Sequence, residues 1–181
     1  MKIRTCWTAM FIAIAVGALA GCSQSTKSVA VSDTIRTAFD QAGLQKVSVA
    51  QDRDKGVVTL GGQVGASADK ERAEALANSI AAGQVVSNQI AVVPPGAEAD
   101  AMTMNSDLDE GIEHNLSAAL TQRKLHDSVK FSVKNHVVTL TGEVDSQSTR
   151  SVAGTVAASV PNVQQVVNEL QIKKQKATSS D

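Results

Sequence analysis

Aromatic residues are scarce in this chain: it has no tyrosine, three phenylalanines and a single tryptophan, Trp7, near the N-terminus. Binding pockets for small molecules usually combine aromatic side chains with a few convergent polar groups. This composition supplies little of that material. We therefore expect a protein that is not an enzyme and that binds no cofactor.

Cysteine is nearly absent as well, since the chain has only Cys6 and Cys22. All residues beyond these two lack a thiol for a disulfide, a metal site or nucleophilic catalysis. His114, His126 and His136 stand apart in the sequence and match none of the common zinc-binding spacings. We therefore expect no metal site.

An excess of charge of one sign is also missing, because 17 basic residues face 18 acidic ones and the formal net charge is -1. Proteins that bind nucleic acid without sequence preference neutralise phosphates with many Lys and Arg residues. This balance argues against a nucleic-acid partner.

No hydrophobic run is long enough for a comfortable membrane span, which needs about 20 residues. The longest apolar run extends from Trp7 to Ala20, with Lys2 and Arg4 before it and small residues after it. That order of charged, apolar and small residues is typical of an export signal. We therefore assign residues 1–21 to a signal peptide.

The end of this signal, Leu19-Ala20-Gly21-Cys22, resembles the lipobox of bacterial lipoproteins. The resemblance implies that Cys22 is lipidated, becomes the first residue of the mature protein and holds it to a membrane through acyl chains. By analogy with such lipoproteins, Ser23 at the next position is compatible with transfer to the outer membrane, where the protein would face the periplasm. The alternative is an ordinary signal peptide that ends near a cysteine.

What the sequence does contain is a repeat: VVTLGGQV at residues 57–64 returns as VVTLTGEV at residues 137–144. With an offset of eighty residues the match extends without a gap over residues 57–92 and 137–172, and twelve of the 36 paired positions are identical. Such self-similarity indicates a duplicated structural unit. The chain therefore divides into a signal at 1–21, a tether at 22–31, domains at 32–93 and 107–174, a linker at 94–106 and a tail at 175–181.

Both units show the same order of periodicities. Alternating apolar residues predict strands at 47–51 and 129–133, and again in the repeated octapeptides and in the segments that end each unit. Helical spacing links Ala73, Leu76, Ala77 and Ile80, and equally Ala153, Val156, Ala157 and Val160. Each unit also opens with a helix, expected to begin at Ser32 or Asp33 and near Ser106 or Asp107, because these residues cap helix N-termini.

The predicted order is therefore helix, strand, strand, helix, strand in each unit. Such a unit is a small α+β sandwich in which two helices pack on a three-stranded sheet. Gly62 and Gly142 end the repeated strand, and glycine fits a bend where a side chain would clash or where φ is positive.

The phrase V-T-L-x-G-x-V, a following Ala-rich helix, and the closing segments VSNQIAV and VVNELQI together resemble the BON domain of bacterial envelope proteins, which often occurs in tandem. The resemblance implies association with phospholipid membranes and a role in envelope integrity or osmotic-stress protection. It also directs attention to residues that can meet an anionic headgroup.

The richest group of such residues lies in TQRKLHDSVKF, where Arg123, Lys124, His126 and Lys130 surround the expected end of a helix. These side chains form our candidate lipid-binding site. The alternative is that cations at a helix C-terminus only complement its dipole. For the same electrostatic reason, an acidic cluster is predicted to cap the start of that helix: Asp107, Asp109, Glu110 and Glu113.

A second interpretation of the whole protein also remains open. The two domains would then bind another envelope protein or a glycan, and the acyl anchor alone would hold the protein to the membrane.

Overall fold

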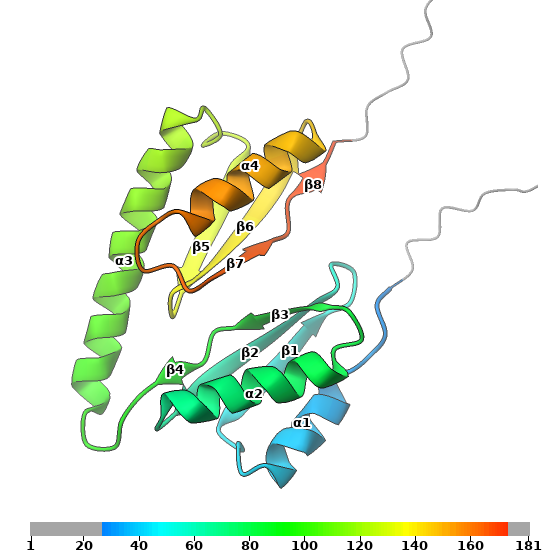
Figure 1. Ribbon diagram of the computed structural model, residues 1–181, viewed down its shortest axis with the longest axis vertical. Coiled ribbons are helices and arrows are strands. Elements are labelled where there is room, and N and C mark those ends of the chain that lie inside the picture. Colours follow the sequence, from blue (N-terminus) through cyan, green and yellow to red (C-terminus); the bar gives the residue numbers. More distant parts are fainter. Residues whose placement is uncertain (1–26, 174–181) are drawn as a thin grey trace, which may run out of the picture.

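The computed structural model describes residues 27–173, which fold into two α+β domains (Figure 1). The predicted signal peptide, the lipidation site Cys22 and the tail at 175–181 lie outside the described residues. Within residues 27–173, no helix combines the length and the hydrophobicity needed to cross a membrane.

The first domain contains two helices on one side of a mixed sheet. Its central strand, β2, pairs antiparallel with β1 and parallel with β3 and with the short β4. The elements, in chain order, are α1 (Ser32–Gln41), β1 (Val47–Asp52), β2 (Val57–Val64), α2 (Ser67–Ile80), β3 (Val85–Asn88) and β4 (Ala91–Val92).

The second domain repeats this arrangement, with β6 as the central strand between β5 and β7. Its elements are α3 (Glu98–Gln122), β5 (Val129–Lys134), β6 (Val137–Val144), α4 (Gln147–Ala158), β7 (Gln165–Asn168) and β8 (Gln171–Ile172). The predicted fold class, two α+β units with helices on a sheet, is confirmed.

The third predicted strand of each domain is divided into two short strands by an asparagine. The side-chain oxygen of Asn88 accepts from the amide of Ile90, and that of Asn168 accepts from the amide of Leu170. Each asparagine also donates to the neighbouring helix, Asn88 to the carboxylate of Glu74 and Asn168 to the carbonyl of Arg150. The asparagine of the repeated motif thus ties the last strand to the second helix.

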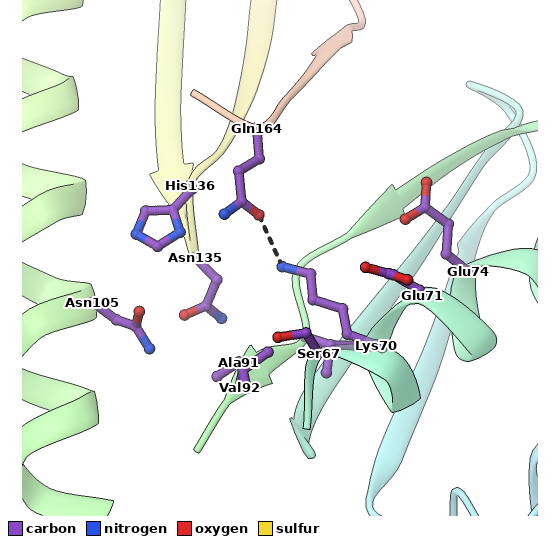
Figure 2. Close-up of a pocket in the computed structure, with 11 residues that line it drawn as sticks. Ser67, Lys70, Glu71, Glu74, Ala91, Val92, Asn105, Asn135, His136 and Gln164 are labelled. Carbon is purple, nitrogen blue, oxygen red and sulfur yellow. Dashed lines mark hydrogen bonds between the residues drawn. The ribbon is translucent and has the colours of Figure 1, made fainter. Parts of the chain in front are cut away.

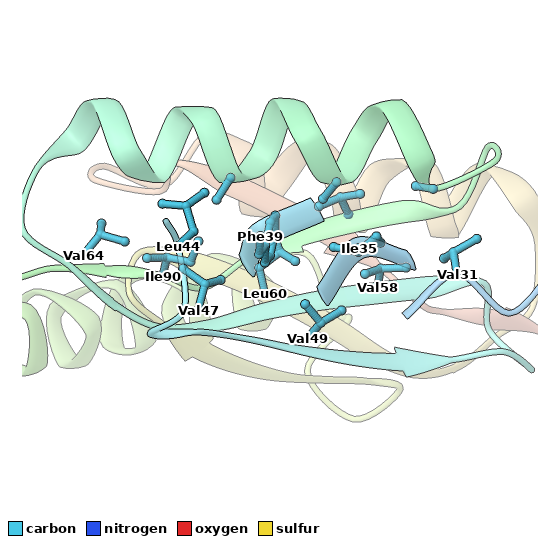
Figure 3. Packing of buried hydrophobic residues seen from close by; sticks show 14 residues of the cluster. Val31, Ile35, Phe39, Leu44, Val47, Val49, Val58, Leu60, Val64 and Ile90 are labelled. Carbon is cyan, nitrogen blue, oxygen red and sulfur yellow. The ribbon is translucent and has the colours of Figure 1, made fainter. Parts of the chain in front are cut away.

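Each domain has its own hydrophobic core between helices and sheet. In the first domain, Ile35 and Phe39 of α1 meet Val58 and Leu60 of β2, and all four side chains are fully buried (Figure 3). The second helices face the sheets with small residues, Ala73 and Ala77 in α2 and Ala153 and Ala157 in α4. These small side chains let helix and sheet approach closely, which explains the Ala-rich pattern.

The first helix begins at Ser32 as predicted, but its capping and the start of α3 differ from the prediction. No side chain caps α1: its N-cap is Val31, whose amide donates instead to the side chain of Gln51. The helix expected to begin near Ser106 begins at Glu98, so much of the predicted linker is helical. Pro94, Pro95 and Gly96 end the preceding strand, but the Ala, Met and Glu residues that follow favour helix.

The two glycines that end the repeated strands adopt backbone conformations that other residues avoid. Gly62 has φ +95° and Gly142 has φ +120°. A Cβ atom at Gly62 would collide with the carbonyl oxygen of Lys46, and one at Gly142 would lie 2.5 Å from the carbonyl oxygen of Ser128. At these bends the neighbouring strand's backbone comes too close for any side chain.

We expect Gly62→Ala and Gly142→Ala each to lower the free energy of unfolding by about 3 kcal/mol, because a positive φ and a backbone clash act together. Gly83→Ala is the matched control, since Gly83 also has positive φ, +82°, but has open space around its α-carbon. It should cost only about 1 kcal/mol. Urea denaturation measures all three, and equal losses would show that the clash contributes nothing.

Candidate functional site

The candidate lipid-binding residues lie at the C-terminal end of α3 and on the strand that follows it. The helix ends at Gln122, and the amide of Leu125 returns to the carbonyl of Leu120 at 2.9 Å. Leu125 packs against the second core, whereas Arg123, Lys124 and His126 beside it are exposed. One partly buried leucine therefore fixes a turn that displays three basic side chains, and we call Arg123, Lys124, His126 and Lys130 the basic corner.

Lys124 holds this turn in the left-handed conformation, with φ 58°. The corresponding turn after α1 has glycine there, since Gly43 has φ +76° and the amide of Leu44 returns to Phe39. The left-handed conformation costs a residue with a side chain about 1 kcal/mol or more. The second domain thus keeps a lysine where glycine would be more stable.

Lys130 completes the basic corner from β5. Side chains on β5 alternate, so that Val129 is buried while Lys130, Ser132 and Lys134 are exposed. Lys130 and Lys134 therefore project from the face of the sheet opposite to the helices. The alternation along β5 already indicated that Lys134 lies on the same face as Lys130. Only the paired sheet shows that no helix covers this face.

Within residues 27–173, four cations elsewhere are ion-paired, whereas those of this region, like the exposed Lys46 and Arg72, are not. Lys27, Arg36, Lys55 and Lys173 all form ion pairs. In the part of the chain that the structure describes, Arg123, Lys124, Lys130 and Lys134 form neither an ion pair nor a side-chain hydrogen bond. Their positive charge is therefore available to an external anion, although Asp127 is exposed in the same turn.

The acidic cluster of α3 does not cap the helix, contrary to the prediction, because α3 begins nine residues before Asp107. The dipole acts within the first turn, where Glu98 and Asp100 stand instead. Asp109 has another role: its two carboxylate oxygens accept the amides of Asn135 and His136 at 2.7 and 2.8 Å. It thereby holds the β5–β6 hairpin turn, whose two residues have φ 47° and 66°.

The histidines lie in three different places. His114 is exposed on α3, His126 belongs to the basic corner and His136 sits in the hairpin turn beside the first domain. Within residues 27–173, no group of three or more His, Cys, Asp or Glu residues is arranged to hold a metal ion.

The junction between the domains is the feature that the sequence did not indicate. The side-chain amide of Gln165 in β7 bonds the backbone of β3 twice, accepting from the Asn88 amide at 2.9 Å and donating to the Val86 carbonyl at 2.6 Å. One side chain thus hydrogen-bonds the free backbone N–H and C=O groups at the edge of the neighbouring sheet, as another strand would. A valine, Val85, occupies the equivalent position in the first domain.

Two further contacts make this junction reciprocal. Lys55, in the first hairpin turn, pairs with Glu169 at 2.6 Å, and Asn135, in the second hairpin turn, donates to the Gln89 carbonyl at 2.7 Å. The offset of eighty residues relates Lys55 to Asn135 and Gln89 to Glu169. Each hairpin therefore contacts the last strand of the other domain, the one that an asparagine divides. The two contacts are related as they would be by a two-fold axis.

A small apolar contact lies within the same junction. Val57, Val137 and Val167 form a buried cluster separate from the two cores. Val57 and Val137 are again equivalent positions of the repeat, each the first residue of its central strand. The first residues of the two central strands thus lie in one small apolar contact, which shields them from solvent.

The family profile of the BON domain matches residues 29–94 and 108–174. The chain belongs to the BON domain family. Both matches coincide with the two structural units, so the tandem arrangement inferred from the repeat is confirmed. Membership of this family points to a non-catalytic module associated with the cell envelope.

A search of curated proteins finds no match. Among solved structures, the chain resembles CdsD, a structural protein of the type III secretion system of Chlamydia trachomatis, with TM-score 0.35, 13% identity and coverage of 76% of this chain and 90% of that one. The C-terminal domain of CdsD gives TM-score 0.33 at 13% identity, with coverage of 76% and 94%.

We expect Gln165→Ala to loosen the junction, because the Asn88 amide, in a residue only 3% exposed, loses its acceptor. One such bond is worth about 1 kcal/mol, so hydrogen exchange at that amide should accelerate about fivefold. Gln171→Ala is the control, since Gln171 is exposed on β8. Unchanged exchange at Asn88 in the Gln165 variant would contradict the bridging role.

Proposed function

We propose that this protein is a lipid-anchored envelope protein whose BON domains associate with anionic phospholipid and so support envelope integrity or osmotic-stress protection. Cys22 would carry the acyl chains, the outer membrane would be the attachment site and the domains would face the periplasm. The basic corner of the second domain would contact phospholipid headgroups.

The observation that carries this proposal is the unpaired charge of the basic corner. Arg123, Lys124 and Lys130 are exposed and without an ion-pair partner among residues 27–173, and Lys124 occupies a strained conformation. Strain at a surface turn is maintained where the residue serves something other than stability. A phosphate group is a suitable partner, because it accepts charge-assisted hydrogen bonds from Lys and Arg.

The second candidate function is binding of another envelope protein or a glycan. One observation favours a protein partner: the first half of α3 exposes Met104 and Leu108, at 64% and 39%, one helical turn apart. Exposed methionine and leucine side chains are common at adaptable protein-binding surfaces. In this case the acyl chains alone would hold the protein to the membrane.

Replacement of Arg123, Lys124 and Lys130 by Gln should weaken binding to vesicles of phosphatidylglycerol and phosphatidylcholine about a hundredfold. Each basic residue near an anionic surface contributes about 1 kcal/mol when all face it together. Co-sedimentation of the soluble Cys22→Ser protein at low and physiological salt measures this loss. The attraction should weaken with salt, since the Debye length is then only about 8 Å.

Two controls separate charge from folding. The first replaces Lys27, Lys46 and Arg72, which are exposed cations of the first domain and its tether, by Gln. The second is Lys124→Gly, which should stabilise the fold by about 1 kcal/mol and yet weaken vesicle binding. Equal and salt-insensitive binding by the wild type and the basic-corner variant would reject this surface and favour the protein-binding alternative.

Within cells, Cys22→Ser should move the protein from the membrane fraction to the soluble periplasm, because no helix within residues 27–173 is able to span the membrane. Fractionation followed by immunoblotting measures the change, and Cys6→Ser is the matched control. A Cys22 variant that stays in the membrane fraction would mean that an uncleaved signal or a dominant protein partner holds it there.

A further inference from the structure

A cleft of about 560 Å³ lies between the two domains, away from the basic corner. Its walls come from α2 and β4 of the first domain and from α3 and the β5–β6 hairpin of the second (Figure 2). Ile90, Ala91 and Val92 form an apolar part of the wall, and the other lining residues are polar. The cleft exists only because the junction holds the domains together.

Lys70 extends from α2 into this cleft, with its ammonium group directed to the side chain of Gln164 (Figure 2). The Nζ–Oε1 distance is 3.3 Å, which is long for a charge-assisted hydrogen bond. The side chain is half-buried, and its burial lowers the pKa of the Lys70 ammonium despite the opposing influence of Glu74 and Asp109. The positive charge is thus incompletely compensated.

The two carboxylates near Lys70 are already engaged elsewhere. Glu74 accepts from the side chain of Asn88 at 2.9 Å, and Asp109 accepts both amides of the β5–β6 hairpin. Glu71 also lines the cleft but is exposed to solvent, which screens its charge. None of these carboxylates forms an ion pair with Lys70 in the part of the chain that the structure describes, so an anion in the cleft would not have to displace one.

Neutral donors surround the same space. The side-chain NH₂ groups of Asn105 and Gln164 donate no hydrogen bond to any residue in the range 27–173, and both residues line the cleft. In that same range, the Nε2 atom of His136 is the single buried side-chain nitrogen or oxygen without a partner. A ring nitrogen of His136, which lines the cleft, is therefore not engaged by the described part of the protein.

We propose that this interdomain cleft binds a small organic carboxylate beside the His136 ring, with Lys70 as the cation and the Asn105 and Gln164 amides as neutral donors. One lysine compensates a monoanion, and amide donors match the two oxygens of a carboxylate. The cleft has no arginine among its lining residues and includes two glutamates, which disfavours a dianionic phosphate more than a monoanionic carboxylate. A free organic acid and the C-terminal carboxylate of a peptide share this chemistry.

Such a ligand would contact both domains at once, because Lys70 belongs to the first and Asn105, His136 and Gln164 belong to the second. A ligand that binds only the closed arrangement stabilises it by mass action. Carboxylate binding therefore strengthens the junction made by Gln165.

Titration of the ¹⁵N-labelled full-length protein in a nonionic detergent tests this site. The probes are sodium acetate, N-acetyl-Ala-Ala, the C-terminal amide of that dipeptide, and inorganic phosphate, at ionic strength held constant with chloride. Acetate and the free-acid dipeptide should shift the side-chain NH₂ signals of Asn105 and Gln164 and the His136 ring signals, and the dipeptide amide should not. The preferred probe of the first two identifies the source of the carboxylate.

Two variants test the role of the ammonium group. Lys70→Gln should weaken carboxylate binding between about tenfold and a hundredfold, the range for one charged hydrogen bond. Lys46→Gln, which removes an exposed lysine of the same domain outside the cleft, is the matched control and should bind as the wild type does. Gln164→Glu should supply an internal carboxylate beside Lys70, abolish binding and raise the melting temperature.

Three outcomes would overturn the proposal. The first is the absence of any shift with acetate or the free-acid dipeptide up to a concentration of about 100 mM, beyond that caused by chloride. The second is phosphate binding more than about tenfold tighter than carboxylate binding. The third is carboxylate binding retained within about twofold in both the Lys70 and the Gln164 variants. Because Gln164→Glu adds an attraction, it keeps the test decisive even if Lys70→Gln fails to fold.

Discussion

The arrangement of the whole molecule depends on one side-chain amide. Gln165 meets the donor and the acceptor that β3 would otherwise leave open, with bonds of 2.9 and 2.6 Å. Around it, Lys55 with Glu169, Asn135 with Gln89 and the buried valines complete the contact. Without this junction there would be two tethered domains, and the cleft beside Lys70 would have only one wall.

Outside the cores, the two copies of the repeat differ at the domain junction and at the turn after the first helix. The bend glycines and the strand-breaking asparagines are shared, because every copy of the fold needs them. Gln165 replaces the valine at position 85, and Lys124 replaces the glycine at position 43 in the equivalent left-handed turn. The residues that build the fold are therefore the same in both copies, whereas a residue at the domain junction and one at an exposed turn differ.

The basic corner and Lys70 place their positive charges in two different environments. The basic corner is exposed, so the proposed attraction to a phospholipid surface would be long-ranged at low salt and would weaken as salt rises. Lys70 is half-buried between domains, so its charge acts only on a ligand that enters the cleft. One site therefore suits a surface and the other a small anion, although the net charge is only -1.

By itself the sequence determined the duplication, the order of elements and the identity of the core. Alternation and helical spacing depend only on local geometry, so strands such as β2 and β6 and the Ala-rich α2 and α4 could be predicted directly. The basic corner was visible for the same reason, since its residues are neighbours in the chain. Its strained lysine was not visible, because φ at Lys124 follows from the packing of Leu125.

Tertiary structure alone decided the rest. The start of α3 was mispredicted because Ser106 and Asp107 look like caps, whereas the helix-forming residues before them continue the helix from Glu98. Asp109 was predicted to cap a helix but instead holds a hairpin turn, because that hairpin, 26 residues away in sequence, folds back beside α3. The junction and the cleft join residues separated by 77 and 94 positions, Asn88 with Gln165 and Lys70 with Gln164. No periodicity records such pairs, because they depend on how two finished domains meet.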